Sequence, residues 1–312
     1  MPESLVLHDR SSSLTATFVP GAGMIGTSLA EDGAEFLGQR RGLDAYIADG
    51  KTMGIPILYP WANRLSGKDY VAGTATVRLD GAPGVRTAPH GAPMHGVLAA
   101  HPGWRVQRSA DELLAVLEFT TPELLAAFPF PHVLTQRVRL ADRTLTITTT
   151  VAPEPGVAVP LCFGYHPYLT IPDVPRADWV LSTPGMRWLP VDDAGLPTGA
   201  HQAWPASAEP LADRALDDGF DEVPEGAVFA IAGGGRRIEV RFGRGYPAAQ
   251  LFAPPDADLV AIEPMAAPTD ALRRGGYRVA EGDPAVFEFG ITVQAAEILS
   301  RTSKSSPNAS AM

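Results

Sequence analysis

The sequence has 312 residues, 45% of them hydrophobic, and its 35 acidic and 25 basic side chains give a formal net charge of −10. This composition indicates a soluble globular protein long enough to bury a large core, as one large β domain or as two ordinary domains. An acidic chain with no basic run gains little from a phosphate backbone, and no stretch approaches the roughly 20 apolar residues of a membrane span, so neither nucleic acid nor a membrane is an expected partner.

The N-terminal stretch MPESLVLHDR has neither the basic region nor the long apolar region of a secretory signal. The single cysteine, Cys162, stands in an apolar run, cannot form an internal disulfide, and is expected to be a buried small hydrophobe. Together these features favour a cytoplasmic protein.

Short runs in which apolar and polar residues alternate recur along the whole chain, as in half-buried β-strands. They lie at 74–79, 114–119, 134–140, 143–151, 237–242 and 286–293. Turn signals separate them, at 80–84, 152–156, 171–175, 192–197 and 233–235. With 31 glycines and 30 prolines in the chain, this spacing indicates many short strands joined by tight turns.

Helix signals are few and short. Residues 121–128 offer a capping Thr121 followed by proline at the first helical position, and 207–218 could hold a second short helix. The glycines of GAGMIG, at 21–26, depart from the dinucleotide-binding GxGxxG pattern and precede no helix, which indicates a turn.

No alternation of strands with helices appears, so the chain is predicted to be all-β and mostly antiparallel. No convincing domain boundary interrupts it before the small, polar residues of the C-terminus. We therefore expect a single domain over 1–299 and a disordered tail at 300–312.

Several common catalytic and metal-binding motifs are missing. One cysteine excludes thiolate clusters, and no GxSxG elbow of a serine hydrolase is present. His90, His95 and His101 lie close together in sequence, but no carboxylate stands among them to complete a zinc site. We expect neither a metal nor a cofactor.

Polar side chains instead stand next to turn residues in otherwise apolar surroundings. Most of them have an ordinary structural interpretation, such as a surface ion pair, a satisfied structural histidine or a turn. The residues concerned are Asn63, Arg64, His95, His166, Asp217, Asp218, Gln250 and Glu263.

Glu263 and His166 fit such interpretations least. Glu263 follows the buried-strand sequence LVAI at 259–262, so its carboxylate ends near the core, where it needs partners or a shifted pKa. His166 also follows an apolar run, and a proline comes directly after each of the two residues. Proline biases the preceding residue to extended backbone and here is expected to end the strand. A rigidly held imidazole and carboxylate form a minimal pair for proton transfer near neutral pH.

In chain order these motifs resemble the aldose 1-epimerase family, the mutarotases, over about residues 15–295. The family tags are NR, HG followed by tryptophan, HPY, DxxF, a strand with glutamine, and EPM. Here they are Asn63-Arg64, His95-Gly96 with Trp104, His166-Pro167-Tyr168, Asp217 to Phe220, Gln250, and Glu263-Pro264-Met265. The resemblance implies a large antiparallel β-sandwich with few short helices, in agreement with the alternation.

The family reaction interconverts the α and β anomers of an aldose without a metal or redox cofactor. A base removes the O1 proton, an acid protonates the ring oxygen, and the opened ring rotates about C1–C2 and recloses on its other face. By resemblance, Glu263 is the base and His166 the acid, and we expect them to converge on one cleft about a sugar's width apart. Sugar-binding roles fall to Asn63, Arg64, His95, Asp217 and Gln250.

The substrate stays open. The short loop after His95 resembles the bacterial branch that includes hexose-6-phosphate mutarotases, and Arg40, Arg41 and Lys68 are available to bind a phosphate. A sugar-binding protein without turnover is the main alternative, and the chain could be a monomer or a homodimer.

Finer choices are open as well. Asp218 is the alternative to Asp217 as the sugar ligand. Burial would raise the pKa of Glu263 while Arg64 would lower it. Three aromatic residues could stack on the apolar face of a sugar, although each is more often core: Trp61, Tyr168 and Phe252.

Overall fold

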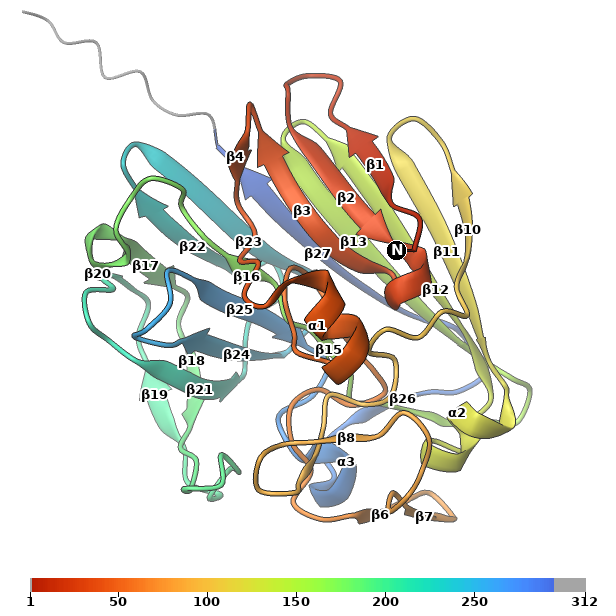
Figure 1. Cartoon of the computed structure of the whole chain (residues 1–312). Coiled ribbons are helices and arrows are strands. Elements are labelled where there is room, and N and C mark those ends of the chain that lie inside the picture. Colours follow the sequence, from red (N-terminus) through yellow and green to blue (C-terminus); the bar gives the residue numbers. More distant parts are fainter. Residues whose placement is uncertain (1, 295–312) are drawn as a thin grey trace, which may run out of the picture.

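The alternating runs form two large antiparallel sheets around a shared core (Figure 1). The computed structural model describes residues 2–294, so the predicted domain end at 299 and the tail at 300–312 lie outside the described residues. The all-β, antiparallel class is confirmed. The described chain holds only three short α-helices, α1 (Gly42–Asp49), α2 (Pro122–Ala127) and α3 (Ala271–Arg274), and none is long and apolar enough to cross a membrane.

The larger sheet has nine strands. In order across it they are β10 (Arg105–Arg108), β11 (Glu112–Phe119), β12 (His132–Ala141), β13 (Thr144–Pro153), β27 (Ala285–Val293), β23 (Arg236–Arg244), β22 (Val228–Gly233), β17 (Val180–Thr183) and β20 (Ser207–Pro210). Five of the six alternating runs predicted from the sequence lie in this sheet, because period-two patterning suits a sheet with one buried face.

The second sheet has eight strands. Across it run β19 (Gln202–Trp204), β18 (Met186–Leu189), β21 (Leu216–Asp221), β24 (Ala248–Ala253), β25 (Val260–Met265), β15 (Gly164–Tyr165) and β5 (Ile57–Leu58), and β16 (Tyr168–Leu169) also pairs with β25. Its central strand β25 is buried along its whole length, as the apolar run of the sequence predicts.

Smaller sheets and turns complete the fold. A four-stranded sheet joins β1 (Leu5–His8), β2 (Thr15–Val19), β3 (Ile25–Glu31) and β4 (Ala34–Glu35). Three strand pairs are β6 (Asp69–Ala72) with β7 (Ala75–Arg78), β8 (Arg86–Thr87) with β9 (Pro93–Met94), and β14 (Val159–Leu161) with β26 (Arg278–Ala280). Two 3-10 turns are η1 (Pro20–Ala22) and η2 (Arg176–Asp178).

The helix predictions have mixed outcomes. Helix α2 is confirmed, with the Thr121 hydroxyl accepting a hydrogen bond from the backbone of Leu124. The helix expected at 207–218 is wrong, because 207–210 pair with β17 at the sheet edge and Leu216 begins β21. The GAGMIG segment forms the predicted turn, through η1 and the left-handed Gly23 into β3. Helix α1 was not predicted.

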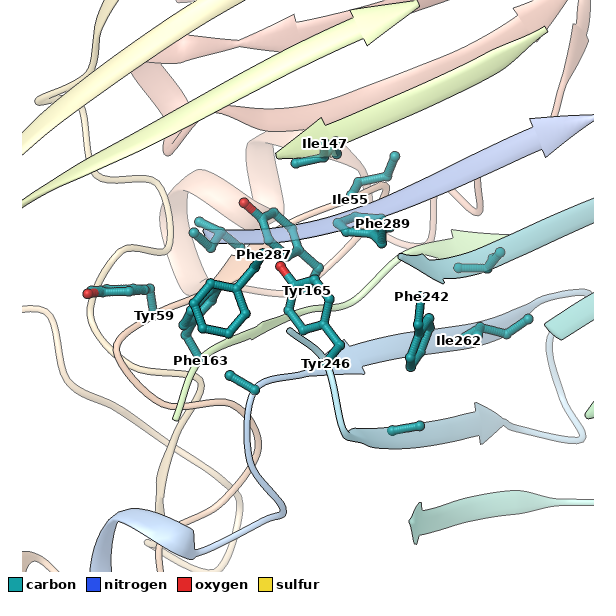
Figure 2. Packing of buried hydrophobic residues seen from close by; sticks show 14 of the residues in the cluster. Ile55, Tyr59, Ile147, Phe163, Tyr165, Phe242, Tyr246, Ile262, Phe287 and Phe289 are labelled. Atoms are coloured by element: carbon teal, nitrogen blue, oxygen red, sulfur yellow. The ribbon is translucent and has the colours of Figure 1, made fainter. Parts of the chain in front are cut away.

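The core lies between the two sheets and is rich in aromatic rings (Figure 2). Phe289 of β27 pairs with Ile147 and Phe242 on the neighbouring strands of the larger sheet. Its ring also lies 5.0 Å from that of Tyr165 in the second sheet, centroid to centroid. The Tyr165 hydroxyl reaches across to hydrogen-bond Thr149 at 2.7 Å, so polar contacts also tie the two sheets together.

Removing the Phe289 ring should therefore weaken the contact between the sheets. Phe289→Ala is expected to lower the free energy of unfolding by about 3–5 kcal/mol, because it loses buried area and leaves a cavity. The matched control is Val71→Ala, whose parent side chain is exposed and should change stability by less than about 0.5 kcal/mol. Urea unfolding measures both, and equal losses would contradict this account of the core.

Candidate active site

Neighbouring strands of the second sheet present polar and aromatic side chains on one face. Pairing aligns Asp217 of β21 with Phe252 of β24, and Gln250 of β24 with Glu263 of β25. The row through Asp217 and Phe252 extends across β25 to Tyr168 of β16, which pairs with the residue two positions before Glu263. Because side chains alternate between faces, residues two apart on a strand share a face, so all five emerge on the same side of the sheet.

That face lines a cavity of about 290 Å³, which brings together six of the seven predicted site residues. They are Asn63, Arg64, His95, His166, Asp217 and Glu263. The six come from β21, β25 and three separate connecting segments, which the fold gathers at one place.

Glu263 and His166 touch directly at the floor of the cavity. Their Oε1 and Nε2 atoms are 3.1 Å apart, and the two side chains are only 2% and 7% exposed. The predicted convergence on one cleft therefore holds, but the predicted spacing of a sugar's width is wrong. The second carboxyl oxygen of Glu263 and Nδ1 of His166 have no partner within the described residues.

Burial controls the protonation of this pair. It raises the pKa of Glu263 well above the ordinary value, Asp217 raises it further, and Arg64 lowers it. Burial likewise lowers the pKa of His166 well below the ordinary value, helped by His95 and Arg40. Burial thus prevails over Arg64 at the carboxyl group, and both groups favour their neutral forms, sharing a hydrogen bond.

The two prolines act differently. Pro167 separates β15 from β16, so His166 lies between two short strands, as predicted. The strand of Glu263 instead continues through Pro264 to Met265, which contradicts the prediction that Pro264 ends it. The backbone nitrogens two residues before and after Pro264 donate to the carbonyls of Pro167 and Phe163, next to β16 and β15. Proline therefore omits a donor on that side only, and pairing with β24 continues.

His95 is held over the pair by a strained loop. Its ring centroid lies 5.8 Å from that of His166, and burial lowers its pKa to about 3, with Arg64 adding to the effect. His95 and Asn63 both have left-handed backbone, with φ of 61° and 55°, and the His95 amide donates to the Asn63 carbonyl at 3.0 Å. A Cβ on Gly96 would lie 1.9 Å from the carbonyl oxygen of Tyr59, so only glycine fits there.

Asp217 is held by two other predicted site residues. Gln250 donates to its Oδ1 at 2.8 Å, and Arg64 approaches its Oδ2 at 3.6 Å. Gln250 does not itself line the cavity and supports Asp217, and its predicted contact with substrate stays a prediction. Asp218 accepts from the indole of Trp188 at 2.9 Å and is also absent from the lining, so of the two carboxylates Asp217 faces the cavity.

Some of the aromatic residues singled out in the sequence line the cavity, and others lie in the core. Tyr168 and Phe252 line the cavity, and Tyr168 stacks on His166 with ring centroids 4.2 Å apart. Trp61 and Trp104 are buried and do not reach the cavity, because they pack in the main hydrophobic core.

Besides Arg64, four cations line the cavity, and only Arg40 and Arg41 among them were named from the sequence as available to a phosphate. The four are Arg40, Arg41, Lys51 and Arg86. The first three flank helix α1, which was not predicted, and none of the four forms an ion pair within residues 2–294. Lys68 does not line this cavity and pairs with Asp80 at 2.9 Å.

The histidine cluster of the sequence is not reproduced in space as a metal site. Of His90, His95 and His101, only His95 lines the cavity, and His101 accepts a hydrogen bond from the backbone of Gly103. Residues 2–294 contain no group of three histidine, cysteine or acidic side chains placed to hold a metal ion.

Comparison with solved structures supports the fold. The Slr1438 protein from Synechocystis sp. PCC 6803 is 23% identical, with 94% of this chain and 96% of that chain covered and a TM-score of 0.75. A putative aldose 1-epimerase from Escherichia coli K12 is 20% identical, with 94% and 99% covered and a TM-score of 0.72. Galactose 1-epimerase from Lactobacillus acidophilus NCFM is 13% identical, with 94% and 99% covered and a TM-score of 0.73.

Comparison of sequences gives the family. No curated protein matches the chain. A family model described as aldose 1-epimerase matches residues 11–283, which is most of the sequence. Together with the shared fold, this match shows that the chain belongs to the aldose 1-epimerase family.

Proposed function

We propose that this protein is an isomerase that interconverts the α and β anomers of an aldose. The observation that carries the proposal is the buried contact between Glu263 and His166 at the floor of a cavity large enough for a monosaccharide. A carboxyl group and an imidazole in contact can exchange a proton, and burial moves the pKa of each toward that of the other.

The short spacing suits the chemistry. In a pyranose, the O1 hydroxyl and the ring oxygen are bonded to the same carbon, C1. The acid and the base must therefore reach two neighbouring oxygens rather than opposite sides of the sugar. Side chains within about 3–3.5 Å of the reacting atoms meet the geometric demand for proton transfer. Glu263 and His166 meet it together only if they lie side by side.

Transfer of the Glu263 proton to His166 Nε2, across the 3.1 Å contact, turns the neutral pair into a carboxylate and an imidazolium. In the forward step the Glu263 carboxylate takes the O1 proton while protonated His166 gives a proton to the ring oxygen. The C1–O bond of the ring breaks and C1=O1 forms, which leaves the open-chain aldehyde. Rotation about C1–C2 presents the other face of the carbonyl, and the two proton transfers then run in reverse. No net proton is gained or lost, so the pair returns to its starting state.

The other lining residues would bind the sugar. Asp217 is about half exposed to the cavity, and its carboxylate can accept from two adjacent hydroxyls. Neutral His95 can donate or accept from above the pair, while Arg64 is a donor only. Phe252 offers an apolar surface for the C–H groups of the sugar.

The cations around the cavity support a second candidate, an aldose that carries an anionic group such as a 6-phosphate. This part of the lining holds four cations and one acidic side chain, Asp49. The cations are Arg40, Arg41, Lys51 and Arg86. Arginine forks and ammonium groups are the donors that bind phosphate most strongly. A neutral aldose leaves these four cations without a partner.

Glu263→Gln should abolish anomerisation while leaving sugar binding largely intact. The amide keeps the shape of the carboxyl group but cannot accept a proton, so the rate should fall about 10²–10⁴-fold. Polarimetry on freshly dissolved α-glucose and α-galactose measures the rate, and calorimetry measures binding. Glu118→Gln, at an exposed carboxylate on β11, is the matched control.

Two outcomes would overturn the catalytic role. The first is an unchanged rate in Glu263→Gln. The second is binding of these aldoses by the folded parent protein without any acceleration of anomerisation over buffer, which would favour a sugar-binding protein without turnover.

The same substitution should stabilise the protein at higher pH. The pKa of Glu263 is raised in the folded state, so the stability that its neutral form contributes is lost as pH rises through the folded pKa. Glutamine stays neutral, so Glu263→Gln should gain stability over the parent as pH increases above the ordinary carboxyl pKa, and gain nothing at lower pH. Urea unfolding at several pH values checks this, and a pH-independent difference would contradict it.

Removing a cation should discriminate between neutral and phosphorylated sugars. In the second candidate, Arg41→Gln is expected to lower kcat/KM for glucose 6-phosphate about tenfold while changing that for glucose little. Lys68→Gln removes an equal charge outside the cavity and serves as the control. A parent enzyme that prefers glucose, with the same ratio in Arg41→Gln, would rule the second candidate out.

A further inference from the structure

Tyr168 makes a set of contacts that the proposed reaction does not yet use. Its ring lies on the His166 imidazole, with centroids 4.2 Å apart and planes within 20°. Its hydroxyl lies 3.2 Å from His166 Nε2, the same nitrogen that contacts Glu263. The hydroxyl also lies 2.7 Å from the Thr52 hydroxyl and accepts from Arg40 at 3.4 Å.

The backbone holds Tyr168 from both sides. Its amide donates to the carbonyl of Gly54 at 2.9 Å, and its carbonyl accepts from Gly38 at 3.0 Å. Gly38 and Gly54 lie on either side of helix α1, so the segment that contains this helix is hydrogen-bonded to Tyr168 at two points. The Tyr168 ring is buried, which fixes the position of the hydroxyl relative to His166.

The protonation state of His166 Nε2 decides whether the Tyr168 hydroxyl can donate a hydrogen bond to it. When His166 Nε2 carries a proton, it can donate to Glu263 or to substrate and offers no lone pair to Tyr168. Once that proton has left, the nitrogen becomes an acceptor, and the Tyr168 hydroxyl can donate to it. Arg40 is always a donor, so it can only supply the Tyr168 oxygen and leaves the hydroxyl proton free for the imidazole.

We propose that Tyr168 is a positioning residue whose hydroxyl, anchored by Thr52, stabilises the neutral imidazole that remains after His166 protonates the sugar ring oxygen. It makes His166 a stronger acid without giving up its own proton. Burial raises the pKa of Tyr168 to about 12, which keeps the phenol protonated throughout. The kinetic consequence rests on the proposed function, whereas the effect on the imidazole does not.

Other groups also face His166. Glu263 on β25 favours the imidazolium when it is ionised, while His95 and Arg40 disfavour the imidazolium. Phe252 of β24 contributes an apolar ring edge, 6.0 Å away between centroids. Tyr168→Phe leaves all of these in place and keeps the stacked ring, so it isolates the hydroxyl.

In Tyr168→Phe the pKa of His166 should rise by about one unit, which is the worth of one hydrogen bond in a buried site. Nuclear magnetic resonance of the labelled imidazole reads this titration directly. With the aldose used by the parent enzyme, kcat should fall about tenfold with KM changed less than about threefold. Thr52→Val should shift both quantities the same way by a smaller amount.

Tyr165→Phe is the control for the loss of a buried tyrosine hydroxyl. It removes hydrogen bonds to Gln136 and Thr149 on the core side, three residues from Tyr168, and should leave the His166 titration unchanged. An unaltered His166 titration in folded Tyr168→Phe would overturn the proposal. If the parent enzyme anomerises no aldose, the proposed function fails, yet the imidazole titration still decides the role of Tyr168.

Discussion

The exclusion of water from Glu263 and His166 is the constraint on which the rest of the site depends. In water a carboxyl group and an imidazole differ in pKa by about two units, so one is mostly the base and the other mostly the acid. Burial raises the pKa of the Glu263 carboxyl group and lowers that of the His166 imidazole, so the two groups are no longer confined to the roles of base and acid. A reaction that runs equally in both directions requires such a pair, because each group must give and take a proton in every turnover.

Keeping two costly groups buried requires a rigid frame, and the antiparallel ladder supplies it. Glu263 is carried by the fully buried β25, paired across its length with β24. Gln250 of the neighbouring strand β24 donates to Asp217, so this carboxylate of the cavity lining is oriented by the same sheet. The group above the pair, His95, comes from a loop, and there Gly96 fixes the backbone by fitting where no Cβ could. The strain in this loop is held by the sheets beneath it.

The strands were predicted correctly because they depend on the local pattern of apolar and polar residues. Alternation predicted the strands because the side-chain period of a strand is two, and an unbroken apolar run predicted β25 because both of its faces are covered. The prediction that Pro264 ends its strand was wrong because a proline's effect depends on which neighbouring strand its nitrogen faces. The prediction of a helix at 207–218 was wrong because pairing at the sheet edge overrode a weak helix propensity. The support of Asp217 by Gln250, and the place of Lys51 and Arg86 with Arg40 and Arg41 in the cavity lining, depend on contacts between distant segments, which no stretch of sequence displays.

The charge of the whole chain and the charge of the cavity have opposite signs, and distance decides which one a ligand meets. A net charge of −10 repels an approaching anion only weakly, because at physiological ionic strength exposed charges are screened beyond about 8 Å. Within the cavity, Arg40 and Arg41 would lie well inside that distance of any bound group. Arg40 also stands over Tyr168, 5.3 Å from its ring centre, and so faces both the ligand space and the partner of His166. An anion that neutralised Arg40 would reduce the positive field that keeps His166 neutral, so substrate charge and acid strength are coupled through this one side chain.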